Sequence, residues 1–168
     1  MNKAFKLDKG NDSLHSVGGI YLAGQSLKTS KITEVFKNQK RANLQFQDVD
    51  LLKSQIGLLV QGRERYTDIG QFRDDEVFMK SLEIKAVASE ETLRQRLEKM
   101  PITHNKLLKQ TNLQLLKKRK LGSITKAGMT FIPLDMDVSP LDNSQSKKEF
   151  VGWTYKGHDG YAPMFSYI

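Results

Sequence analysis

Near the C-terminal end of this chain, an apolar run ends in two closely spaced carboxylates. The run is FIPLDMDVS, residues 131–139, in which one residue separates Asp135 from Asp137. In an extended strand, residues two apart point the same way, so we expect both carboxylates on one face. Neighbouring carboxylates repel each other unless a cation compensates, and a divalent metal commonly does so. The alternative is a solvated turn, because the following Ser-Pro pair also marks a strand giving way to a loop.

The composition narrows the class of protein. The 168 residues suffice for one domain or two small ones, with a core that needs no cross-links. The lack of cysteine excludes a disulfide framework, a zinc finger and a thiol nucleophile, and it is compatible with a reducing cytosol. The formal charge of +8 favours a polyanionic partner such as nucleic acid, although ribosomal and membrane-surface proteins share this charge.

The sequence shows neither a membrane span nor a targeting segment. No stretch approaches the roughly 20 apolar residues that cross a bilayer. Residues 1–12 lack the hydrophobic core of a signal peptide. We therefore expect a cytoplasmic protein with no membrane partner.

Helical spacing of apolar residues dominates the first part of the chain. Residues 1–16 are polar and expected to be loosely held, and two short helices follow them. A longer helix is predicted with Asp48 as its N-cap, and it ends near Gly62. Residues 67–80 suit short helices that pack on this one.

The next helix, residues 89–100, is the best candidate for reading DNA. Ser89 caps it, acids occupy its first turn and bases follow, in agreement with the helix dipole. With its leucines and Met100 facing inward, the outward side chains that could contact phosphates and base edges are Thr92, Gln95, Arg96 and Lys99. Together with a short preceding helix, this pattern is compatible with a helix-turn-helix. The alternative is a capped surface helix with solvated charges.

A further helix is predicted over residues 103–119, with leucines inward and lysines outward. It ends in a basic run that either clamps a DNA backbone or is simply solvated: Lys117, Lys118, Arg119 and Lys120. Residues 122–128 are predicted as a linker between two domains. After it, the sequence predicts a strand over 129–138, a polar loop over 139–148, an ill-defined segment over 149–156, a turn at 157–160 and a second strand over 161–168.

Two segments of the second half resemble a known family. LDMDVS (residues 134–139), followed by YKGHDGYAPMF (residues 155–165), resembles the first two strands of the catalytic core of DDE-type insertion-sequence transposases. The group 1 branch has a D-x-D-x-[ST] strand and then a K-G-x-x-G-Y-x-P segment. The helix SEETLRQRL (residues 89–97) is similar to the S-x-x-T-L-x-R-x-L helix that these proteins carry ahead of the core.

The resemblance implies an α+β chain. A mainly helical, helix-turn-helix-like DNA-binding region would occupy residues 1–121, and 122–128 would be the linker. Residues 129–168 would form the first strands of an incomplete RNase H-like α/β core. The implied partner is DNA at the terminal inverted repeats of a bacterial insertion sequence, and a homodimer of the full-length protein is left open.

The implied activity is magnesium-dependent DNA cleavage and strand transfer. In such a site three carboxylates hold two Mg²⁺ or Mn²⁺ ions, one activating the attacking oxygen and the other stabilising the leaving one. Asp137 matches the first catalytic acid of the family, and Asp135 is the neighbour most easily confused with it. The second and third acids of the family lie beyond the second strand, where this sequence has ended. The resemblance assigns no role to the remaining nearby acids, Asp142, Glu149 and Asp159.

We therefore expect an N-terminal portion of a transposase that is catalytically incomplete and binds no metal stably. We also expect poor solubility or local disorder from about residue 129, because two strands alone leave open edges. One alternative is a non-catalytic basic DNA-binding protein. The other is a D-x-D phosphatase with Asp135 as nucleophile and Asp137 as general acid and base. That class usually has Thr or Val where Ser139 stands, and it needs a Lys and further acids.

Overall fold

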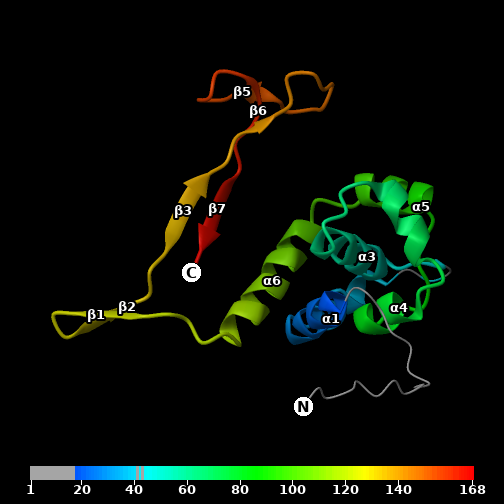
Figure 1. Ribbon diagram of the computed structural model, residues 1–168, viewed down its shortest axis with the longest axis horizontal. Helices are drawn as coiled ribbons and strands as arrows, with labels where there is room; N and C mark the ends of the chain where they lie inside the picture. The colour runs from blue at the N-terminus through cyan, green and yellow to red at the C-terminus, as the bar shows by residue number, and fades with distance from the viewer. Residues whose placement is uncertain (1–17, 41, 43) are drawn as a thin grey trace, which may run out of the picture. The chain divides into compact units, whose positions relative to one another are not determined.

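The computed structural model describes residues 18–40, 42 and 44–168, which divide into two compact units between Lys118 and Arg119 (Figure 1). The described part of the first unit contains only helices and turns, whereas the second contains only strands and turns (Figure 1). The expected α+β class is therefore confirmed. The division falls a few residues ahead of the predicted linker.

The first unit consists of short helices. Their bounds are α1 (Gly19–Thr29), α2 (Ile32–Val35), the 3-10 helix η1 (Lys37–Gln39), α3 (Asp48–Val60), the 3-10 helix η2 (Tyr66–Phe72), α4 (Glu76–Leu82), α5 (Glu90–Glu98) and α6 (His104–Lys117). The predicted longer helix is α3, and the two helices predicted for 89–100 and 103–119 are α5 and α6. Residues 1–16, expected to be loosely held, lie outside the described residues.

Two apolar clusters hold these helices together. The larger one joins α1, α3, η2, α4 and α5, and Phe72 and Phe78 stack within it with ring centroids 4.5 Å apart. The smaller one centres on Ile32, Phe36 and Val49, with leucines of α6 packed against it. Apolar residues at helical spacing thus form the core of this unit, as predicted.

Glycines allow the closest helix contacts of this core. A Cβ atom at Gly24 of α1 would lie 1.8 Å from the Ser81 carbonyl oxygen of α4. At Gly57 of α3, a Cβ would lie 2.7 Å from a methyl carbon of Leu82 and 2.9 Å from the Phe78 ring. Because glycine has no side chain, α4 can approach both helices at these points.

Local capping sets where helices begin. The Ser89 hydroxyl accepts a hydrogen bond from the Thr92 N–H at 3.3 Å, which confirms the predicted cap of α5. Asp75 caps α4 in the same way. The predicted cap of α3 is wrong by one residue, since Gln47 occupies the N-cap position and Asp48 is the first helical residue. Its carboxylate contacts other helices instead.

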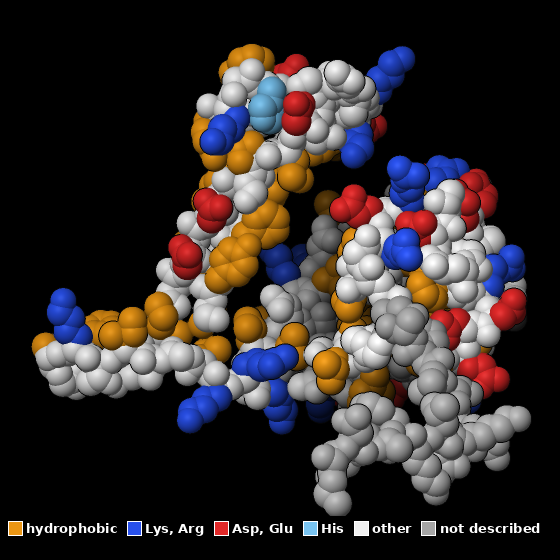
Figure 2. All heavy atoms as spheres, viewed as in Figure 1, with side chains coloured by type: hydrophobic (Ala, Val, Ile, Leu, Met, Phe, Trp, Pro, Cys, Tyr) orange, Lys and Arg blue, Asp and Glu red, His pale blue; other side chains and the backbone are white. Residues whose placement is uncertain are grey.

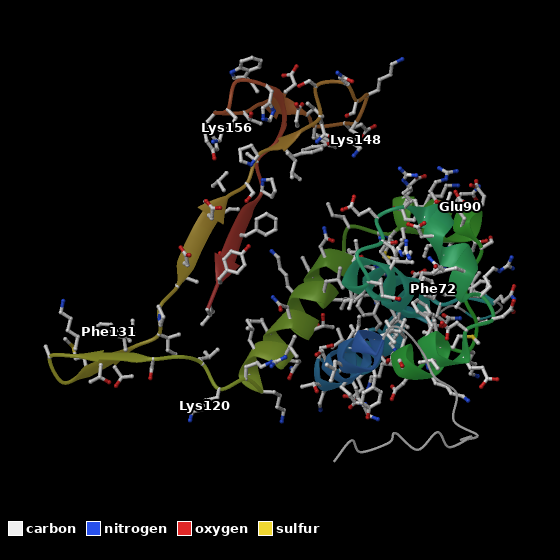
Figure 3. All side chains as sticks on the ribbon, viewed as in Figure 1. Phe72, Glu90, Lys120, Phe131, Lys148 and Lys156 are labelled. Carbon is white, nitrogen blue, oxygen red and sulfur yellow. The ribbon has the colours of Figure 1, made fainter. Side chains whose placement is uncertain are left out.

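The second unit contains three small antiparallel sheets. They are the pair β1 (Ile124–Lys126) and β2 (Met129–Phe131), the pair β3 (Asp135–Val138) and β7 (Met164–Tyr167), and a sheet in the order β4 (Leu141–Asp142), β6 (Asp159–Tyr161), β5 (Gly152–Trp153). Every residue of this unit is described, and only Thr154 and Gly160 are buried. Figure 3 shows side chains crowded around Phe72 in the first unit and sparse around Phe131 in the second.

Three predictions for this region need correction. The predicted linker contains β1, which turns back onto β2 through Ala127 and Gly128, both with positive φ as in a type I′ turn. The strand predicted over 129–138 is two strands, β2 and β3, and Pro133 lies in the break between them. The predicted polar loop contains β4. No sheet exceeds three strands in this fully described unit, so the RNase H-like core stays a prediction.

Candidate catalytic strand and nucleic-acid interface

The two predicted catalytic acids lie together on β3. In the register of the β3–β7 ribbon, Asp135 stands opposite Tyr167 and Asp137 stands opposite Phe165. Directly opposed residues of an antiparallel pair share a face, so the two carboxylates lie on one face with these two aromatic rings. Met136 and Val138 alternate to the other face. Figure 2 shows acidic and hydrophobic side chains exposed together along this ribbon.

The carboxylates of this pair are free to bind a ligand. Both residues are exposed, and among the described residues neither has a hydrogen-bond or ion-pair partner. Carboxylate oxygens are the ligands that Mg²⁺ and Mn²⁺ prefer, so the pair fits such an ion in chemical kind. The number of ligands is too small for a complete site, because the described residues contain no group of three or more acidic, His or Cys side chains that could hold a metal. They supply at most part of a three-carboxylate site.

The nearby Asp142 ends strand β4 and is bound by the turn that follows it. Its Oδ1 accepts hydrogen bonds from the Ser144 hydroxyl at 2.6 Å and the Ser144 N–H at 2.9 Å, and these bonds lower the pKa of Asp142. His158 Nδ1 lies 3.9 Å from the same oxygen and 3.3 Å from the Thr154 hydroxyl. These contacts stabilise the β4–β6–β5 sheet. They account for the positions of Asp142 and His158 without a bound metal.

Helix α5 presents only part of the predicted DNA-reading face. Leu93 is fully buried, while Gln95 and Lys99 are exposed as predicted. Thr92 is half-buried, and its hydroxyl accepts a hydrogen bond from Ser89 at 2.9 Å. The outward orientation predicted for Arg96 is wrong, because only 23% of its side chain is exposed and it turns toward the core.

Arg96 instead completes a buried charged network that joins three helices. Its guanidinium donates to one Asp48 carboxylate oxygen and, at 3.3 Å, to the Phe46 carbonyl. The other Asp48 oxygen lies 3.2 Å from His104 Nε2, and Asp48 and His104 are both almost fully buried. A buried carboxylate requires such partners because its desolvation is costly. The start of α3, the last turn of α5 and the start of α6 are thereby fixed together.

The predicted helix-turn-helix is not confirmed. Residues 83–89 separate α4 from α5, whereas the motif joins its helices by a turn of about three to four residues. Helix α5 packs on α3 and η2. Its role in reading DNA therefore stays a prediction.

Helix α6 carries an exposed row of basic side chains. Leu107, Leu108 and Thr111 face the core, and Lys106 and Lys109 face solvent, as predicted. The predicted basic run is exposed throughout, and among the described residues none of its members has an ion-pair partner: Lys117, Lys118, Arg119 and Lys120. It crosses the division between the two units, so two of its residues belong to each.

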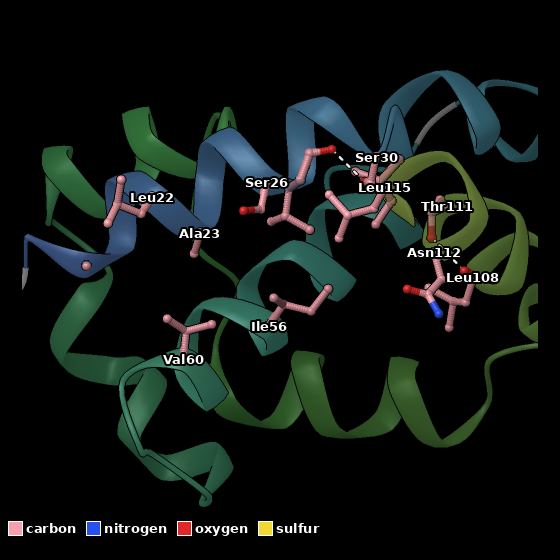
Figure 4. A pocket seen from close by; sticks show the side chains of 13 residues that line it. Leu22, Ala23, Ser26, Ser30, Ile56, Val60, Leu108, Thr111, Asn112 and Leu115 are labelled. Atoms are coloured by element: carbon pink, nitrogen blue, oxygen red, sulfur yellow. Dashed lines mark hydrogen bonds between the residues drawn. The ribbon is translucent and has the colours of Figure 1, made fainter. Parts of the chain in front are cut away.

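An apolar groove of the first unit is unsuited to a metal or a phosphate. Figure 4 shows this groove of about 450 Å³, lined by α1, α2, α3 and α6. Leu22, Val60 and Leu108 are typical of its lining, and no charged side chain borders it. Within the described residues, no helix has the length and apolar content needed to cross a membrane.

Comparison with known families gives one match that spans nearly the whole sequence. The family described as transposase DDE domain, group 1, matches residues 2–168, a range that includes both the helical unit and the acidic strand. Neither the curated proteins nor the solved structures contain a match to this chain. The chain therefore belongs to the group 1 family of transposase DDE domains.

Proposed function

We propose that this chain acts in DNA transposition at the ends of a bacterial insertion sequence, binding terminal inverted repeats and contributing β3 to a metal-dependent DNA-cleaving centre. The observation that carries the proposal is the family match over residues 2–168, in which the unpaired carboxylates of Asp135 and Asp137 share a strand face. The net charge of +8 supports a polyanionic partner.

The acidic pair would hold part of the metal site. Asp137 takes the position of the family's first acid, and pairing of β3 with β7 fixes the direction in which its carboxylate points. A divalent ion bound there would supply Lewis-acid stabilisation of the phosphodiester oxygens during strand cleavage and transfer. Because the described residues gather no third ligand, we propose that cleavage requires further acids, and that DNA binding is the activity of this chain in isolation.

The DNA-binding surface is best sought on α5, α6 and the basic run after them. Gln95 and Lys99 are the exposed polar side chains of the predicted reading face, and Lys106 and Lys109 add positive charge on α6. Exposed Lys and Arg side chains without ion-pair partners can neutralise phosphates without first breaking a contact within the protein. Arg96 is not proposed as a DNA contact, because it is bound to Asp48.

The proposal is tested by measuring binding of the full chain to terminal-repeat duplex DNA over a range of salt concentrations. Combined alanine substitution of Lys117, Lys118, Arg119 and Lys120 should weaken binding and reduce the salt slope by about 0.9 for each lost phosphate contact. The matched control replaces four other exposed lysines, Lys37, Lys40, Lys147 and Lys148, and loses the same charge. Equal weakening in both variants would show that the basic run has no special role.

A further inference from the structure

One buried cation of the first unit lacks a full set of partners. Lys53 of α3 is 3% exposed, and its Nζ donates a single hydrogen bond within the described residues, to the Glu83 carbonyl oxygen at 3.4 Å. An ammonium group has three donors, so two are left for another acceptor. Burial lowers the pKa of Lys53, while the negative charges of Glu83 and Asp50 oppose that shift.

Lys53 borders a small polar pocket. The pocket has a volume of about 150 Å³ and lies among α1, the start of α2, α3 and the end of α4. At roughly 30 Å³ for each water molecule, it holds about five waters, which is enough for a tetrahedral oxyanion but not for a nucleoside. Two further ammonium groups, from Lys28 and Lys31, line the same space, and so do the carboxylates of Glu34 and Glu83.

The two rim lysines are held only by exposed ion pairs. Lys28 Nζ lies 3.1 Å from a Glu83 carboxylate oxygen, and Lys31 Nζ lies 3.6 Å from one of Glu34. All four side chains are more than half exposed. Exposed pairs of this kind contribute little to stability, so both lysines can turn toward an incoming anion at little cost.

We propose that this pocket binds a phosphate group, held by Lys53 from inside and by Lys28 and Lys31 at the rim. Phosphate oxygens would accept hydrogen bonds from the two remaining N–H groups of Lys53, and the negative charge of the phosphate would compensate the buried positive charge. The phosphate comes either from a DNA backbone or from free inorganic phosphate. The pocket shares no lining residue with the basic run after α6 or with the acidic strand.

A simpler role for Lys53 is to cap the carbonyl end of α4, and the experiment must distinguish the two roles. Inorganic phosphate is titrated into the full chain at constant ionic strength set with chloride, and amide NMR signals and the melting temperature are followed. Phosphate should raise the melting temperature and shift signals of residues 28–34 and Lys53. Lys53→Met should weaken phosphate binding at least tenfold, whereas Lys80→Met, with equal charge loss at an exposed residue of α4, should leave it unchanged.

A phosphate effect no larger than that of chloride would overturn the proposal, as would equal losses in the two variants. If Lys53→Met fails to fold, the exposed Lys31→Met replaces it, and undiminished phosphate binding in that variant would also overturn the proposal. Competition between phosphate and duplex DNA at fixed ionic strength would identify the DNA backbone as the source. Phosphate binding without competition would identify the free ion. Retained DNA binding without any phosphate effect would reject the pocket alone and leave the proposed function standing.

Discussion

The two units of this chain bury apolar side chains to very different extents. In the helical unit, Ile69, Phe78 and Leu93 are completely buried. In the strand unit, Trp153 is 75% exposed and Phe131 is 49% exposed. The helical unit is therefore stabilised by burial, whereas the strand unit depends on backbone pairing and tight turns. The expected poor solubility or local disorder from about residue 129 stays a prediction, and its physical reason is that exposed apolar strands with open edges favour association.

A large effect is expected in the charged network of the helical unit. Arg96→Ala would leave the buried Asp48 carboxylate with His104 but without its guanidinium partner. We expect a loss in the lower part of the roughly 3–5 kcal/mol range that follows removal of one partner from a buried pair. Urea unfolding followed by circular dichroism at 222 nm measures this loss.

Arg94→Ala is the matched control on the same helix. Arg94 is exposed and pairs with Glu91 at 2.8 Å and Glu98 at 3.1 Å. Exposed pairs contribute at most about 1 kcal/mol, so this variant should unfold almost as the wild type does. If Arg94→Ala were as destabilising as Arg96→Ala, the network would have no special role in the helical unit.

The contrast in burial can be tested with one residue from each unit. Leu93→Ala should lower the free energy of unfolding of the helical unit by about 2–5 kcal/mol, because it leaves a cavity in the core. Phe131→Ala should leave the helical transition unchanged, since its ring lies in the other unit and is half-exposed. A similar shift of the helical transition by both variants would show that the two units unfold as one.

Helix packing around α4 gives a smaller expected effect. Gly24→Ala places a methyl group against the Ser81 carbonyl, and it should cost about 1–3 kcal/mol from overpacking, less the gain in helix propensity. Gly70→Ala is the control, because nothing lies within 4 Å of a Cβ atom there. Thermal unfolding of both variants makes the comparison, and equal melting temperatures would contradict the close approach of α1 and α4.

The sequence predicted best what depends on neighbouring residues. Spacing and capping within each segment predicted helices α3, α5 and α6. They also predicted the Ser89 cap and the buried face of α6. The shared face of Asp135 and Asp137 follows from the alternation of a strand in the same way. The RNase H-like core and the reading of DNA by α5 depend on the family resemblance, and they stay predictions.

What the sequence did not reveal depends on distant contacts or on very short elements. Asp48 meets Arg96 and His104 across separations of 48 and 56 residues, which periodicity does not report. One local signal was available, because Arg96 lies three residues after the buried Leu93 and so shares its side of the helix. Strand β1 has three residues, too few for an alternation pattern, whereas Pro133 could have indicated the break between β2 and β3.

Weak Mn²⁺ binding to the full chain, followed by paramagnetic broadening of amide NMR signals, tests most directly whether the acidic strand is part of a divalent-metal centre. We predict that broadening is strongest along β3 and is lost in Asp137→Asn. It should persist in Asp142→Asn, which removes an acid of the same unit that is held by Ser144. Broadening that spares β3, or that is lost equally in both variants, would contradict that role of the strand.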